Sequence, residues 1–207
     1  MKWKNDLIKD IRFGDSRDDI DDSFGDLIEL TRNKTEVFGE FSPNNHKALQ
    51  LAINSCLEKP KTFLEIGVCR NNSYSSTHTI LKNVPTDGVY LGVDIEDKSY
   101  LNDKTRGIHT IQTSSSNYEV VVNKLNELGV VSLDFIFIDG WHSINQVLID
   151  WEYSKLLSPA GVVAFHDTTS HPGPYYFTKF LDKTSWEVFE NICPTDHGFG
   201  YCFRKRK

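Results

Sequence analysis

The feature of the sequence that most constrains the fold is a series of short, nearly continuous apolar runs that each end on an acidic residue. The clearest run extends from Leu133 to Asp139, and similar runs end at Asp94 and Asp167. Strands that are apolar throughout are typical of a parallel sheet covered on both faces, whereas a half-exposed strand alternates. Segments with apolar residues at helical spacing separate the runs. The pattern predicts an α/β fold, a Rossmann-like and mostly parallel twisted sheet with helices on both faces.

The predicted elements alternate along a chain of 207 residues, which is long enough for one domain. We expect strands at 62–68, 89–94, 109–112, 133–139 and 161–167, and helices at 46–57, 118–128 and 145–157, with a further helix ending at residue 82. Near the C-terminus we expect a helix at 175–181 and two antiparallel edge strands at 186–190 and 200–204. Residues 1–45, which include several Asp, are predicted to form an N-terminal arm or lid, and residues 46–207 the domain itself.

Composition excludes several classes of partner. The net charge of -6 argues against a protein that holds nucleic acid by neutralising phosphates, which needs a basic face. The four cysteines form no Cys-x-x-Cys pair, and the first residues contain no apolar run that would serve as a signal peptide, so we expect a reduced, cytoplasmic protein. No segment approaches the roughly 18 apolar residues of a membrane span, so no membrane insertion is expected.

The polar residues that end the strands are the candidates for a functional site. In an open parallel sheet, ligands bind outside the carboxyl ends of the strands, near the point where the strand order switches. These ends carry acidic, histidine and small polar residues that would converge on one rim: Glu65, Gly67, Asp94, Ser114, Ser115, Asp139, His142, His166 and Asp167.

The loop after the first strand, residues 65–71, narrows the class of ligand. It lacks the G-x-G-x-x-G spacing that brings a helix to a pyrophosphate, and it lacks the Walker pattern, so a dinucleotide and a nucleoside triphosphate are both disfavoured. An acid before a single glycine, Glu65 and Gly67, suits a ligand with a cationic group. Asp94 ends the second strand, where an acid accepts hydrogen bonds from ribose hydroxyls. Adenosine with a cationic attachment fits both; the alternatives are a helix cap or surface acid for Glu65 and a turn residue for Asp94.

These motifs carry a family resemblance. Residues 63–68, 91–94 and 135–140 resemble the successive motifs of class I S-adenosylmethionine (SAM)-dependent methyltransferases. Ile138–His142 followed by Gly161–Asp167 is similar to the small-molecule O-methyltransferase group that includes cephalosporin-hydroxylase-like and macrolide-sugar enzymes. The resemblance implies that residues 46–207 form a SAM-dependent methyltransferase domain.

The resemblance also implies a cofactor site. Glu65 and Gly67 would lie at the methionine end of SAM, Asp94 at the ribose and Ser115 near the adenine. One departure is Asn71, which stands where many relatives have a second glycine, although Asn tolerates the left-handed backbone region better than most residues. The full expected set of cofactor-binding residues is Glu65, Gly67, Val68, Asn71, Ser73, Asp94, Ser115 and Asp139.

A metal site is expected beside the cofactor. A divalent metal lowers the pKa of a bound hydroxyl and orients it, and Asp139 and Asp167 end two strands as an oxygen-ligand pair that suits Mg²⁺. The resemblance implies that acids at these two motifs bind the metal, Mg²⁺ or Mn²⁺. His166 stands where some relatives have a second acid. As a ligand, its imidazole would shift the preference toward Mn²⁺, Fe²⁺ or Zn²⁺; alternatively it faces away, since adjacent strand residues point in opposite directions. Asp167 is favoured over His166.

His142 is the expected general base, acting beside Asp139, because an ordinary imidazole titrates near neutral pH and this one lies on the same rim. The alternative is a histidine at the start of a helix that faces solvent. His171 is interpreted as an ordinary loop residue or a substrate or lid residue.

Together these observations predict metal-assisted O-methylation of a small hydroxylated acceptor, such as a sugar or natural product. Two alternatives stay open. One is an NAD(P)-dependent oxidoreductase on a Rossmann-like fold, and the other is a non-catalytic SAM-binding module. The aromatic residues of the N-terminal arm make a homodimer a further expectation.

Overall fold

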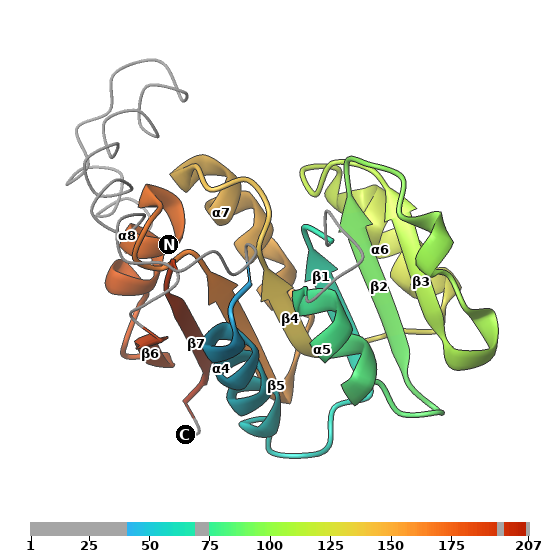
Figure 1. The fold of residues 1–207 in the computed structure, drawn as a ribbon, viewed down its shortest axis with the longest axis horizontal. Helices are drawn as coiled ribbons and strands as arrows, with labels where there is room; N and C mark the ends of the chain where they lie inside the picture. The colour runs from blue at the N-terminus through green and yellow to red at the C-terminus, as the bar shows by residue number, and fades with distance from the viewer. Residues whose placement is uncertain (1–40, 69–74, 194–196, 206–207) are drawn as a thin grey trace.

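A computed structural model describes residues 41–68, 75–193 and 197–205 of the chain. They form a seven-stranded sheet with the order β3-β2-β1-β4-β5-β7-β6 (Figure 1). Five strands are parallel: β1 (Thr62–Ile66), β2 (Val89–Asp94), β3 (Ile108–Gln112), β4 (Leu133–Ile138) and β5 (Leu157–His166). Two antiparallel strands complete one edge: β6 (Trp186–Cys193) and β7 (Phe199–Arg204). The expected fold class and the antiparallel edge pair are confirmed.

The order of the parallel strands switches between β1 and β4. From β1 the chain runs outward to β2 and β3, and it then returns to place β4 on the other side of β1. The connections that follow β1 and β4 lead to helices on opposite faces of the sheet, and ligands bind at such a point in sheets of this kind.

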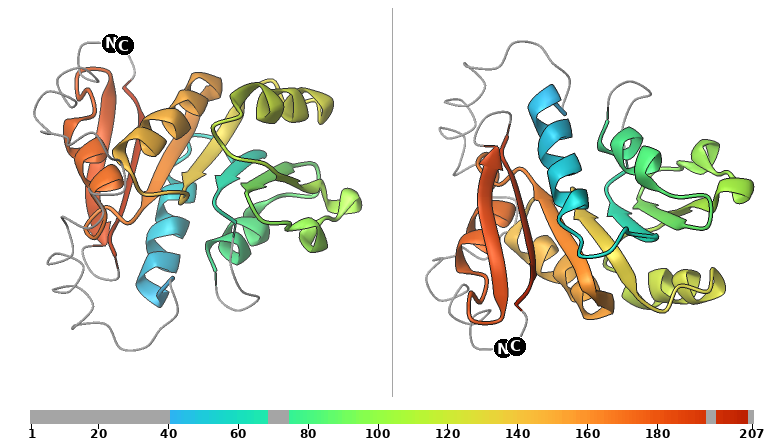
Figure 2. Two further views of the ribbon diagram at one scale, coloured as in Figure 1. Left: turned by 90° about the horizontal axis from the view of Figure 1, so that it is seen from above. Right: turned by 90° about the horizontal axis from the view of Figure 1, so that it is seen from below.

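Helices cover both faces of the sheet (Figure 2). Apolar residues of α4 (Pro43–Asn54) and α5 (Ser76–Asn83) join one buried cluster. Those of α6 (Tyr118–Glu127), α7 (Ile144–Asp150) and α8 (Pro172–Phe180) join the other. Three short 3₁₀ helices complete the described elements: η1 (Ser99–Leu101), η2 (Lys104–Arg106) and η3 (Trp151–Leu156). Because both faces are covered, the central strands β1, β2, β4 and β5 are mostly apolar and buried, as the sequence pattern requires.

The helix α4 begins earlier than its apolar spacing indicated. Ser42 caps it by accepting a hydrogen bond from the backbone N–H of Asn45 at 3.2 Å, and Pro43 occupies the first turn, where its missing N–H costs nothing. The expected boundary at residues 45 and 46 therefore falls inside a helix that is already part of the core. The remainder of the expected arm, residues 1–40, lies outside the described residues.

The connection from α7 to β5 also differs from expectation. The predicted helix over 145–157 is a shorter α-helix followed by η3, and β5 begins at Leu157, ahead of Pro159 and Gly161. A register shift opposite Leu133 and Phe135 lets this early segment join the sheet, and Pro159 is exposed at the irregular stretch. A proline that lacks an N–H donor is tolerated at such a position.

Within the described ranges, no helix is long and apolar enough to cross a membrane.

Candidate active site

Four of the predicted residues meet at the carboxyl ends of β4 and β5. Asp139 directly follows β4, His166 is the last residue of β5, and Asp167 follows it. His142 lies in the short connection between β4 and α7. These four residues therefore lie on one rim of the sheet.

The side chain of His166 faces the two carboxylates. Its Nδ1 lies 3.2 Å from Asp139 Oδ1 and 3.2 Å from Asp167 Oδ2. Successive residues of an extended strand point to opposite faces, but Asp167 has a φ of 60°, and this left-handed turn brings its carboxylate back beside His166. A non-glycine residue held at positive φ is strained, and such strain is concentrated at functional sites.

His142 is paired with the same carboxylates. Its Nε2 lies 2.8 Å from Asp167 Oδ2 and 3.9 Å from Asp139 Oδ1. Burial by itself would lower the pKa of His142, but the charges of Asp167 and Asp139 outweigh burial and raise it to about 10. The imidazole is thus protonated at neutral pH in this structure, whereas an ordinary pKa was expected. The solvent-facing alternative does not describe it, since it forms this ion pair.

Asp167 is surrounded by further histidines. His171 Nε2 and His197 Nδ1 each lie 3.9 Å from its Oδ1, and Ser170 Oγ donates a hydrogen bond to the same oxygen. Burial would raise the pKa of Asp167, but the charges of His166 and His142 hold it well below its usual value. The ring of His171 lies against His142, with 4.1 Å between centroids. Burial and the neighbouring imidazoles lower the pKa of His171 to about 4.

Sequence reasoning missed Asn45 and His197. Asn45 is fully buried on α4, and its Nδ2 lies 2.9 Å from Nε2 of His166. The signal for it was available, because Asn45 is the one polar residue on the helix face formed by Ala48, Leu49, Ala52 and Ile53. His197 precedes β7, and only the pairing of that strand with β5 brings it to the site.

The loop after β1 packs tightly against the loop after β4. Gly67 has a φ of 83°, and a Cβ added there would lie 1.9 Å from the backbone oxygen of Asp139. Asp94 accepts hydrogen bonds from the backbone N–H groups of Val68 and Glu96, both at 2.8 Å. Asp94 thus supports the loop beside Gly67. Asn71 and Ser73 lie outside the described residues.

Glu65 does not lie at the surface. Its side chain is fully buried, and it accepts hydrogen bonds from Ser76 Oγ at 2.7 Å, Thr77 Oγ1 at 3.0 Å and Tyr90 Oη at 2.5 Å. Burial raises the pKa of Glu65 to about 7, although the three hydroxyl donors act in the opposite direction. The alternative of a surface acid is wrong, and the carboxyl joins β1, β2 and the start of α5.

Ser115, which follows β3, is linked to a second buried acid, Asp150 of α7. Gln146 Nε2 donates to Ser115 Oγ at 2.9 Å and to Asp150 Oδ1 at 2.9 Å. Burial raises the pKa of Asp150 to about 6, although its hydrogen bonds to Ser115 and Gln146 lower it. Tyr153 donates its hydroxyl hydrogen to the backbone oxygen of Ser115 at 2.6 Å. Sequence reasoning missed Asp150, which lies on α7 rather than at a strand end.

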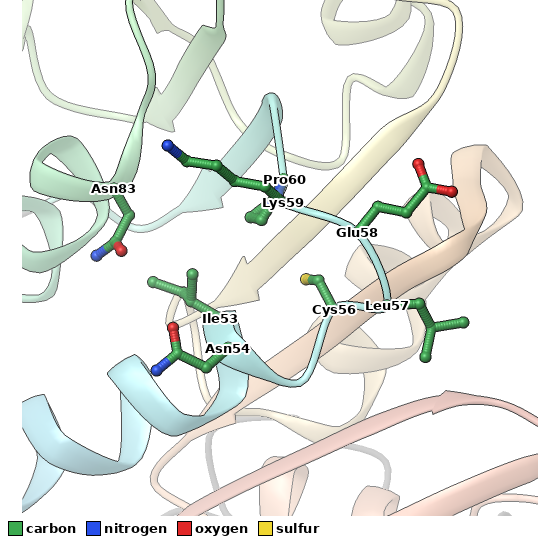
Figure 3. Close-up of a pocket in the computed structure, with 8 residues that line it drawn as sticks. All are labelled: Ile53, Asn54, Cys56, Leu57, Glu58, Lys59, Pro60 and Asn83. Atoms are coloured by element: carbon green, nitrogen blue, oxygen red, sulfur yellow. The ribbon is translucent and has the colours of Figure 1, made fainter.

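A cavity of about 420 Å³ lies elsewhere, between the end of α4, the connection to β1 and Asn83 (Figure 3). This is the amino end of the parallel strands, opposite the rim that carries the histidines and acids. Burial, reinforced by the charge of Asp134, raises the pKa of Cys56 in its wall to about 12. The thiol is therefore protonated at neutral pH and is not a nucleophile.

Comparison with known proteins assigns the chain to a family. The methyltransferase-domain family matches residues 64–168, which is half of the chain. The chain belongs to this family of methyltransferase domains, and the resemblance expected from its motifs is confirmed. A search of curated protein sequences gave no match.

Solved structures share the fold. The MycE methyltransferase of the mycinamycin biosynthetic pathway, in complex with Mg and SAH, is 19% identical over 87% of this chain and has a TM-score of 0.53. A MycE complex with Mg, SAH and mycinamycin VI gives 18% identity and a TM-score of 0.52. This chain spans about half of MycE, 55% in both complexes. The O-methyltransferase TomG from Streptomyces achromogenes, involved in tomaymycin synthesis and bound to SAM, is 15% identical, with a TM-score of 0.54, over 89% of this chain and 90% of its own.

Proposed function

We propose that this chain transfers a methyl group from SAM to a hydroxyl of a small acceptor, a sugar or natural product, with the help of a divalent metal. The observation that carries the proposal is the cluster of Asp139, His142, His166 and Asp167 beside the Gly67 loop. Methyl transfer to oxygen requires a positioned acceptor and removal of its proton, and the carboxylates and imidazoles of this cluster would serve both purposes. MycE carries Mg and SAH on the same fold.

The cofactor would lie along the ends of β1, β2 and β3. Glu65 and Gly67 would lie at its methionine end, Asp94 at its ribose and Ser115 near its adenine, and Val68 and Asp139 belong to the same proposed set. Glu65 would contribute by positioning the start of α5, because it accepts hydrogen bonds from Ser76 and Thr77. Asn71 and Ser73 complete the proposed set from the sequence alone.

The chemistry of the donor set fits a divalent cation. Asp139, His166 and Asp167 each offer a ligand atom, and these atoms all lie within 4.8 Å of one another. A bound cation, Mg²⁺ or Mn²⁺, would lower the pKa of an acceptor hydroxyl and orient it. With Asp139 and Asp167 bound to the cation, His142 would release its own proton to solvent, and the neutral imidazole would then accept the proton of the acceptor hydroxyl. Its raised pKa in this structure depends on those two carboxylates.

Two measurements test the methyltransferase proposal on the full chain. S-adenosylhomocysteine at 100 times its Kd should stabilise the protein by about 2.7 kcal/mol, which corresponds to a rise in Tm of roughly 5–10 °C, while NAD should leave Tm unchanged. Formation of S-adenosylhomocysteine should be detected with a panel of sugars and glycosylated natural products. Stabilisation by NAD alone would favour the oxidoreductase, and binding of the cofactor without turnover the non-catalytic module.

Variants then test the metal-assisted step. Asp139→Asn and Asp167→Asn should abolish methyl transfer with a smaller loss of cofactor binding, and His142→Ala should lower the rate at neutral pH. Asp87→Asn, at an exposed acid paired with Lys61, is the control and should retain full activity. Full turnover in excess EDTA or in the Asp139/Asp167 double variant would contradict the metal role.

The domain organisation, cellular location and assembly of the protein are also proposed. The catalytic domain would include the whole of α4, with the residues before it as an arm or lid in place of the expected residues 1–45, and the protein would act in the cytoplasm, with a homodimer as its expected assembly.

A further inference from the structure

The cluster of Asp139, His166 and Asp167 contains an imidazole where an all-oxygen metal site would have a carboxylate. His166 is the only residue at the end of β5 with a nitrogen donor, and its Nδ1 lies 3.2 Å from one oxygen of each carboxylate. Ligands about 2.1 Å from one metal, at a right angle to each other, are about 3 Å apart. The spacing in this structure is therefore close to that of neighbouring ligands on one ion.

The ring of His166 is fixed in this orientation. Its side chain is buried, and its Nε2 lies within hydrogen-bonding distance of the amide of Asn45, 2.9 Å from Nδ2. The ring of Phe41 packs on it with 5.0 Å between centroids. A histidine that ligates a metal is typically held through its second ring nitrogen, which fixes the tautomer and orientation. Asn45 has this position. Because a metal-bound Nδ1 carries no hydrogen, Nε2 would carry the ring hydrogen and donate it, and the Asn45 amide would turn so that Oδ1, instead of Nδ2, faces Nε2.

Two further imidazoles lie close to Asp167. His142 and His171 form a second group with Asp167, in which one ligand atom from each residue lies within 4.8 Å of the others. Carboxylate and water ligands suit Mg²⁺, whereas imidazole suits later first-row metals, whose affinities rise from Mn²⁺ toward Cu²⁺. The surroundings of Asp167 are thus richer in nitrogen than a magnesium site requires.

We propose that His166 Nδ1 is a metal ligand together with Asp139 and Asp167, held by Asn45, and that this site selects a first-row transition metal such as Mn²⁺ or Co²⁺ over Mg²⁺. The inference deepens the proposed function by naming the class of metal. It is independent of turnover, because it concerns binding of the ion by these residues.

The first test uses the wild-type full chain after removal of metal with a chelator. Mn²⁺ binding is followed by the electron paramagnetic resonance signal of the free ion, with Mg²⁺ as the competitor. We expect Mn²⁺ to bind at least about tenfold more tightly than Mg²⁺. Pulsed resonance of the bound Mn²⁺ should detect a coordinated imidazole nitrogen. Equal affinities, a site without a nitrogen ligand, or no binding of either ion would each overturn the proposal.

Variants assign the nitrogen to His166. His166→Glu, which restores an all-oxygen set, should reduce the preference for Mn²⁺ over Mg²⁺. Loss of the partner that orients a ligand typically costs 10–100-fold in affinity, so Asn45→Leu should weaken Mn²⁺ binding by roughly that factor. His109→Ala, at a half-buried histidine on β3, is the matched control and should bind both ions as the wild type does.

If His166→Glu does not fold, as judged by circular dichroism, the nitrogen signal is measured in His142→Ala, His171→Ala and His197→Ala instead. Persistence in all three supports His166, and loss in any of them overturns the assignment. Binding of S-adenosylhomocysteine is measured in parallel. Metal selectivity without cofactor binding would leave this inference intact and contradict the proposed function, whereas cofactor binding and turnover with equal affinity for the two ions would do the reverse.

Discussion

The carboxyl group of Glu65 is buried between β1, β2 and α5 and depends on three hydroxyl groups for its hydrogen bonds. Desolvation penalises its charged form, so its pKa rises from 4.5 to about 7 in the folded protein. The folded state consequently binds a proton more tightly than the unfolded state. The contribution of Glu65 to stability is fully present below pH 4.5 and is lost as the pH rises to 7.

We predict that Glu65→Gln reduces this pH dependence. One pKa unit corresponds to about 1.4 kcal/mol, so the wild type should lose on the order of 3 kcal/mol more than the variant between pH 4.5 and 7.5. Urea unfolding at several pH values measures the difference. Glu119→Gln, at an exposed acid in the first turn of α6, should behave as the wild type. Parallel pH curves for Glu65→Gln and the wild type would show that the carboxyl is not desolvated as described.

At the scale of elements, the site depends on how closely two loops approach. Gly67 after β1 and the backbone of Asp139 after β4 leave no space for a Cβ, because the nearest atom would be 1.9 Å away. Parallel pairing of β1 with β4 brings the two loops to the same rim, and the positive φ of Gly67 turns the first loop away from its strand. The position of the rim therefore depends on the backbone geometry of these two loops.

Gly67→Ala should therefore disrupt both stability and cofactor binding. Gly129 offers a matched control, because its φ is also positive, at 74°, but a Cβ there would meet no atom within 4 Å. Gly129→Ala should cost about 1–2 kcal/mol from the left-handed conformation alone. Gly67→Ala should cost more in urea unfolding and weaken S-adenosylhomocysteine binding in calorimetry. Similar stability losses and unchanged binding for the two variants would refute the close contact.

For the whole molecule, the hairpin of β6 and β7 is part of the core rather than an appendage. Phe199 is fully buried at the start of β7 and stacks on Phe137 of β4, with 5.9 Å between ring centroids. On the other face, Trp186 of β6 contacts Trp151 at 4.7 Å. The hairpin thus joins both buried clusters and should unfold together with the parallel sheet.

Phe199→Ala should lower the stability of the entire domain by about 3–5 kcal/mol, because it leaves a cavity in the core. Circular dichroism and tryptophan fluorescence should report one shared transition at a lower urea concentration. Phe189→Ala, at a 36% exposed position on β6, should cost clearly less. Two separate transitions in the Phe199 variant would mean that the hairpin is an independent unit.

Much of this arrangement was predictable from the sequence, because apolar runs and their terminal residues are local signals. The strands ending at Asp94 and near Asp139 and Asp167 follow directly from that pattern, and parallel strands bring their ends to one rim. The start of β5 was not predictable, since Leu157 joins the sheet only through a register shift opposite β4. Nor was the pKa of His142, which depends on the distance to Asp167 and on burial.

The sequence by itself determined the fold class, the rim on which the polar residues converge and the methyltransferase family, since each depends on local periodicity or on short motifs. Only the tertiary structure decided which atoms of those residues face one another. The amide of Asn45 beside His166, the ion pair of His142 with Asp167 and the burial of Glu65 all arise from contacts between segments distant in the chain. No local pattern encodes a distance or a desolvation, and these two quantities set the charge and donor atoms of the site.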